Sequence, residues 1–77
     1  MLKFYVKRIN TLQKPILNFY ASDSEYTDKP YDYFPPIIIA DFNTEMLYIK
    51  RDQHWINSID RIIALWQFVK SEVEKVK

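Results

Sequence analysis

The chain contains no glycine and no cysteine among its 77 residues, and this double absence limits both its turns and its means of stabilisation. Without glycine, a tight turn must hold another residue at positive φ, which asparagine tolerates better than most. Without cysteine, neither a disulfide nor a thiolate metal site is available. We expect one domain spanning residues 1–77, and a domain this short buries only about 60% of its unfolded surface. Association with a second copy or a permanent partner is therefore an expected source of further stability.

The same absences exclude most catalytic sites. A chain without glycine forms neither a glycine-rich phosphate loop nor a glycine-flanked nucleophile elbow. His54 is the only histidine, and a zinc site would need several carboxylates to converge on it. Ser58, His54 and Asp52 are too close together in sequence for a catalytic triad. The sequence thus predicts a binding protein rather than an enzyme, with no cofactor, no metal ion and no small-molecule substrate.

Composition favours a folded domain outside the membrane. Hydrophobic residues make up 48% of the chain and aromatic residues 17%, which is typical of a domain with a core. No apolar run is long enough to cross a membrane and no secretory signal is evident, so we expect a cytoplasmic protein. The net charge of +1 argues against a polycationic arm or a mimic of DNA. The bias towards Ile, Lys, Tyr, Phe and Asn suggests an AT-rich genome, such as that of a low-GC bacterium or its phage.

Four segments are predicted to be strands, and the first of them alternates between apolar and polar residues, as half-buried strands do. These segments are residues 2–9, 15–21, 37–42 and 46–51. An Asn-Thr pair begins the connection after the first segment and another lies between the third and fourth. We therefore expect two hairpins, with Asn10 and Asn43 at the positions that need positive φ.

A helix is predicted from about residue 53 to about residue 75, because apolar residues there recur at alternating spacings of four and three. Asp52 or Asn57 would cap it. The apolar stripe comprises Trp55, Ile59, Ile62, Trp66, Val69, Val73 and Val76. We expect the stripe to cover one face of a four-stranded antiparallel sheet, which gives an α+β domain of two hairpins and one long C-terminal helix. The stripe also fits a heptad repeat, which leaves a coiled-coil dimer as an alternative.

Leu65 and Phe68 fall off this stripe. At roughly 100° per residue they lie on the polar side of the predicted helix. An exposed phenylalanine on a helix indicates a partner surface. The alternative is that the tyrosine-rich loop folds over these two side chains.

The segment 22–36 is the one clear loop in the sequence, and it is both acidic and aromatic. Loops this long in small domains are usually functional or disordered. Tyrosine supplies a large contact area at low entropic cost, so the loop suits a basic partner surface. Its aromatic residues are Tyr26, Tyr31, Tyr33 and Phe34. Alternatively, the loop is solvated and these aromatics fold back against the sheet.

A basic and aromatic face is predicted on the side of the sheet turned away from the helix. Single-stranded nucleic acids are bound by such faces, because bases stack on tyrosine and phosphates pair with lysine. The residues concerned are Lys3, Tyr5, Lys7, Tyr20, Tyr48 and Lys50. Ordinary strand amphipathicity explains the same pattern, since tyrosine and lysine are common on solvent-facing strands.

The sequence from Tyr48 to Trp55, a strand end followed by an amphipathic helix, resembles the end of the transcriptional positive-cofactor family. That resemblance implies a β4α fold and binding of single-stranded DNA. It covers only this segment. The glycine-rich turn that precedes the last strand in that family is replaced here by residues 41–45, so the resemblance is one of architecture.

Together these patterns predict a small protein-binding regulator or inhibitor, of the kind that phages and other mobile elements carry. It would act by occupying the surface of a partner protein, through the loop and through Leu65 and Phe68, and we expect it to be a homodimer or a subunit. The alternative function is single-stranded nucleic-acid binding by the basic and aromatic face.

Overall fold

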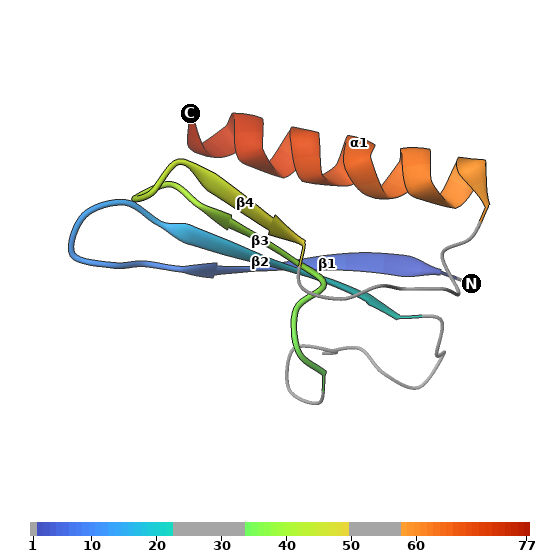
Figure 1. The fold of residues 1–77 in the computed structure, drawn as a ribbon, viewed down its shortest axis with the longest axis horizontal. Coiled ribbons are helices and arrows are strands. Elements are labelled where there is room, and N and C mark those ends of the chain that lie inside the picture. Colours follow the sequence, from blue (N-terminus) through green and yellow to red (C-terminus); the bar gives the residue numbers. More distant parts are fainter. Residues whose placement is uncertain (1, 23–33, 50–57) are drawn as a thin grey trace.

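The computed structural model describes residues 2–22, 34–49 and 58–77, and it shows a four-stranded antiparallel sheet with one helix over one of its faces (Figure 1). The strands are β1 (Lys3–Ile9), β2 (Ile16–Ser22), β3 (Ile38–Asp41) and β4 (Met46–Ile49), followed by helix α1 (Ile59–Val76). The strands lie in the sheet in their chain order, each antiparallel to the next. The predicted α+β fold is confirmed.

The strand register separates the two faces of the sheet, because residues directly opposite each other in an antiparallel pair share a face. One cross-strand row on the helix side is Val6, Phe19, Ile38 and Ile49. The next row on that side is Arg8, Leu17, Ala40 and Leu47. On the central strands these side chains form the core, and Phe19 is completely buried.

Phe68 is the side chain that joins α1 to the sheet. Its ring centroid lies 5.8 Å from that of Phe4 on β1. It also lies 6.1 Å from that of Phe19 on β2, in an edge-to-face arrangement. Leu65 and Val69, one helical turn apart, are buried beside it. Aromatic pairs contribute about 0.5–1.5 kcal/mol beyond their area burial, so these contacts fix α1 over β1 and β2 rather than over β4.

The predicted apolar stripe is wrong in its N-terminal half. Leu65 is only 8% exposed, whereas Ile59 and Trp66 on the stripe are 75% and 37% exposed. The C-terminal part of the stripe does pack on the core, through Val69 and Val73. The physical reason is that a repeat of 3.5 residues drifts by about 20° per heptad around a straight helix, so one straight contact line cannot follow it throughout.

The helix begins later than predicted. Ser58 is its N-cap, with extended backbone angles (φ −96°, ψ 147°), and its Oγ accepts a hydrogen bond from the Arg61 N–H at 3.1 Å. Asp60 in the first turn interacts favourably with the helix dipole. Asp52 and Asn57, the two predicted caps, lie outside the described residues. Because Ser58 is extended, a helix running continuously from about residue 53 is wrong.

Neither predicted asparagine supplies the positive φ angle in the turns. Among the described residues only Glu45 has positive φ, 59°, at the last position before β4. Asn43 instead joins the two turns at one end of the sheet. Its Nδ2 donates to the Lys14 carbonyl and its Oδ1 accepts from the Lys14 N–H, both at 2.9 Å. The side-chain amide thus pairs with the backbone of the β1–β2 connection as a neighbouring strand would.

Candidate protein-binding surface

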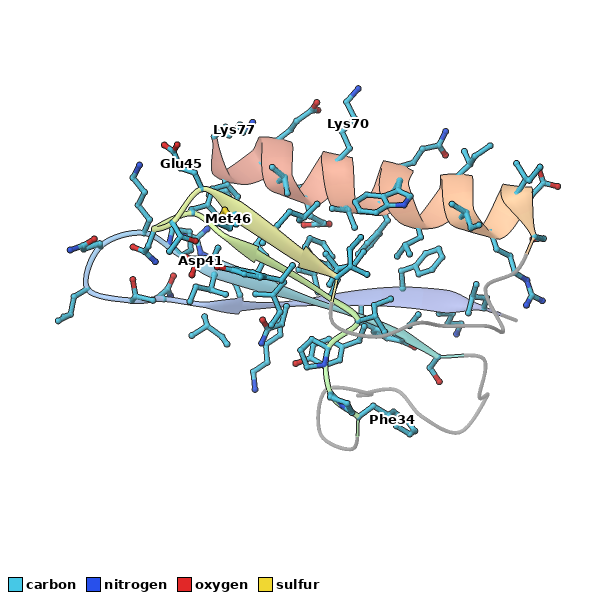
Figure 2. All side chains as sticks on the ribbon, in the orientation of Figure 1. Phe34, Asp41, Glu45, Met46, Lys70 and Lys77 are labelled. Carbon is cyan, nitrogen blue, oxygen red and sulfur yellow. The ribbon has the colours of Figure 1, made fainter. Side chains whose placement is uncertain are left out.

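The structure does not support Leu65 and Phe68 as a partner surface. Both belong to the contact between α1 and the sheet, so the prediction that they are exposed is wrong. Of the four loop aromatics, Phe34 is 50% exposed and lies on the side of the sheet away from α1 (Figure 2). Tyr26, Tyr31 and Tyr33 lie outside the described residues.

A different apolar surface is exposed, along the flank of α1 that borders β4. We call it the α1–β4 surface. It consists of Leu47 and Ile49 on β4 and Ile59, Ile62, Ile63 and Trp66 on α1. Leu47 and Ile49 are 46% and 68% exposed, although both point to the helix side of the sheet. The position of α1 explains this exposure, because a helix held over β1 and β2 by Phe68 leaves β4 uncovered.

The four helical members lie on one side of α1. Ile59, Ile62, Ile63 and Trp66 are 75%, 41%, 49% and 37% exposed, and their spacing of three and four residues gives them a common side. Figure 1 shows that β4 and α1 run in opposite directions, so moving along β4 from Leu47 to Ile49 corresponds to moving along α1 from Trp66 towards Ile59. The strand and helix residues therefore form one elongated surface.

A groove of about 660 Å³ lies between α1 and the β3–β4 hairpin at one end of this surface. Trp66, Val69 and Val73 line its helix side, and Ala40 and Leu47 line its sheet side. Charged side chains of both signs surround the apolar groove near the hairpin turn (Figure 2). They are Lys14, Asp41, Glu45 and Lys77. Lys70 also lines the groove, and Figure 2 shows its side chain directed away from the sheet.

The two edges of the described sheet differ in charge. β4 reads Met-Leu-Tyr-Ile, all four residues are exposed, and none is charged. β1, at the opposite edge, carries Lys3, Lys7 and Arg8. Proteins usually protect an edge strand from pairing with another chain by charge, proline or a bulge. β1 has such protection through its charges, whereas β4 has none within the strand.

The face of the sheet turned away from α1 is only in part as predicted. The register does place Lys3, Tyr5 and Lys7 on the same face as Tyr20 and Tyr48. Lys3 and Lys7 are exposed and Tyr48 is 39% exposed. Tyr20, however, is only 5% exposed, so its ring is not available for a base to stack on. Lys50 lies outside the described residues.

The described residues contain no group of three or more His, Cys, Asp or Glu side chains that could hold a metal ion. Within the same residues, no helix has both the length and the apolar character needed to cross a membrane. His54 and Asp52 lie outside them. No protein-family model matches the chain, and no curated protein or solved structure matches it at a significant level.

Sequence reasoning missed the α1–β4 surface because it assigned the wrong side of α1 to the core. One signal was present: the fourth predicted strand begins with four consecutive uncharged residues, Met46 to Ile49. An uncharged strand is consistent with either a central or an unprotected edge position, and only the strand order distinguishes the two.

Proposed function

We propose that this protein is a non-enzymatic protein-binding module and that the α1–β4 surface is its binding surface. The observation that carries the proposal is the exposure of six large apolar side chains, four along one flank of α1 and two on the adjacent strand β4, while the neighbouring flank of α1 forms the core. Contiguous apolar patches with a polar border mark protein interaction sites. The charged residues around the groove would fix the orientation of the partner, since charge complementarity contributes more to specificity than to affinity.

The size of the surface supports this function. Large side chains present roughly 200 Å² each, so the exposed fractions correspond to roughly 600 Å² of apolar area. Specific interfaces cover about 800 Å² per partner and are about 56–65% apolar. The α1–β4 surface therefore supplies the apolar area that an interface of standard size needs.

We further propose that the protein acts in the cytoplasm as a small regulator or inhibitor, of the type that phages and other mobile elements carry. It would act by occupying a surface of its partner. The exposed Phe34 and the other loop aromatics, Tyr26, Tyr31 and Tyr33, would then form a second contact on the opposite side of the sheet. The half-exposed Phe34 supports that contact.

Affinity capture tests the proposal. The tagged protein is used to capture proteins from cells that also express an untagged copy, and the captured proteins are identified by mass spectrometry. Ile62→Lys places a charge in the α1–β4 surface, and Leu12→Lys, at a fully exposed leucine of the β1–β2 connection, is the matched control. Burial of an isoleucine contributes roughly 1.5–3 kcal/mol, so we expect at least tenfold weaker capture with Ile62→Lys. Leu12→Lys should capture as the wild type does.

The proposal is wrong if the wild type, Ile62→Lys and Leu12→Lys capture the same proteins in the same amounts. Phe34→Ala serves to test the loop contact separately. A loss of capture with Phe34→Ala alone would place the binding surface on the opposite side of the sheet and contradict the role of the α1–β4 surface.

Single-stranded nucleic-acid binding is the second candidate, favoured by one observation. The register brings Lys7 and Tyr48 into the same cross-strand row on the face away from α1, with Lys3 and Tyr5 on that face too. Fluorescence anisotropy with a labelled oligonucleotide should then show binding that weakens steeply as salt is added. Absence of binding at low salt would exclude this candidate.

A further inference from the structure

We propose that the occupant of the α1–β4 surface is a second copy of this chain, and that the two copies pair through their β4 strands. The two strands would be antiparallel, with a two-fold axis at Tyr48, and would join two four-stranded sheets into one of eight strands. This inference rests on the proposed function, because it names the partner of the same surface.

The first argument is the difference between the two sheet edges. An incoming strand at β1 would meet Lys3, Lys7 and Arg8, and two copies of that edge would bring like charges together. At β4 it would meet four uncharged residues, all of them exposed. Of the two edges, β4 is therefore the one suited to symmetric pairing.

The second argument is the direction of the backbone groups. The Phe42 N–H donates to the Pro15 carbonyl at 3.3 Å, which continues the β2–β3 ladder one residue past Asp41. Because bonded and non-bonded pairs alternate along an antiparallel ladder, Asp41 and Ile39 direct their backbone groups towards β4 instead. Their partners on β4 are Met46 and Tyr48.

It follows that Leu47 and Ile49 direct their N–H and C=O groups away from β3, at the edge of the described sheet. Among the antiparallel registers in which such groups oppose each other, the one centred on Tyr48 pairs both of these residues of each strand. In that register Leu47 of each copy lies opposite Ile49 of the other and exchanges backbone hydrogen bonds with it, while the two copies of Tyr48 form the non-bonded pair at the two-fold axis. A shift by one residue would place the apolar side chains on the wrong face.

The third argument is that the apolar side chains agree with this register. Leu47 and Ile49 of both copies would meet on the helix side of the joined sheet, flanked by the exposed side of each α1. The roughly 600 Å² of apolar area per copy is of the size that a stable interface needs.

The oligomeric state is the first measurement. Sedimentation equilibrium over a range of concentrations should give twice the monomer mass of 9.4 kDa for the wild type. Leu47→Lys should give the monomer mass, because it brings two positive charges into the pairing region. Leu12→Lys, outside the surface, should remain dimeric. A wild type that is monomeric up to its solubility limit would overturn the inference.

Single cysteine variants then test the register, since the wild-type chain has no cysteine to compete. In Tyr48→Cys the two Cα atoms would be about 4.5 Å apart across the axis, which is within disulfide range. In Leu47→Cys the like residues would be about 8 Å apart, beyond that range. Lys7→Cys on β1 is the control for random collision. Under mild oxidation we expect a covalent dimer from Tyr48→Cys only, and equal crosslinking of all three variants, or none of Tyr48→Cys, would overturn the β4 pairing.

The outcomes separate this inference from the proposed function. Suppose that the wild type is monomeric and that Ile62→Lys captures less of some protein than the wild type does. That protein, and not a second copy of this chain, then occupies the α1–β4 surface, so the inference is wrong and the proposed function is retained. If the wild type is monomeric and Ile62→Lys changes nothing in capture, both are wrong.

Discussion

Replacing Phe68 with alanine tests the orientation of α1, because it removes the ring that contacts Phe4 and Phe19. Truncation of a buried phenylalanine costs about 3–5 kcal/mol, and the partial exposure of Phe68 places the expected loss at about 3 kcal/mol. A domain of this length has a total stability of about 4–12 kcal/mol. The variant should therefore lose a large fraction of its stability, and its Tm should fall by more than 12 °C, at about 4–8 °C per kcal/mol.

The assay is urea and thermal unfolding followed by circular dichroism, at one fixed protein concentration because self-association contributes to stability. Gln67→Ala is the matched control, since Gln67 is exposed on the same helix and lies outside the α1–β4 surface. It should change the free energy of unfolding by less than about 0.5 kcal/mol. The reasoning is refuted if Phe68→Ala unfolds at the same urea concentration and the same temperature as Gln67→Ala.

Three further changes probe the turns and the helix cap. Glu45→Gly should raise the free energy of unfolding by about 1 kcal/mol, because glycine adopts positive φ without strain; an unchanged or lower urea midpoint would contradict this. Asn43→Ala should cost about 1 kcal/mol, since it removes the acceptor of the Lys14 N–H and one of the donors to the Lys14 carbonyl, which keeps its hydrogen bond from the Thr11 hydroxyl; hydrogen exchange should accelerate in both connected turns rather than in one. Ser58→Ala should cost about 1 kcal/mol by removing the acceptor of the Arg61 N–H, whereas Ser58→Asp should retain the cap; equal unfolding midpoints for the two variants would argue against a capping role.

The strands were predictable from the sequence because their signal is local. Alternation with a period of two places β2 at 15–21 in the sequence, and the structure places it at Ile16–Ser22. The orientation of α1 was not predictable in the same way. Both flanks of the helix are apolar, and the side chains that decide between them, Phe4 and Phe19, are far away in sequence.

The candidate surface was harder to predict than the fold. Leu65 and Phe68 were assigned to it because they interrupt a regular pattern. A phenylalanine ring that packs against two other aromatic rings is nevertheless stabilised by burial, even where its position departs from that pattern. Tyr20 shows the same limit on the opposite face, where alternation predicted its direction but not its burial. Which residues are exposed depends on where the helix crosses the sheet, and no single segment of sequence contains that information.

The order of the elements also has a consequence for synthesis on the ribosome. Every strand pairs with its neighbour in the chain, so the sheet can assemble as soon as β4 has emerged. Phe19 and the rest of the inner face then have no cover until α1 is translated and Phe68 reaches them. During that interval the nascent sheet displays both an apolar face and an uncharged edge, which makes it a substrate for chaperones and a risk for aggregation between neighbouring ribosomes.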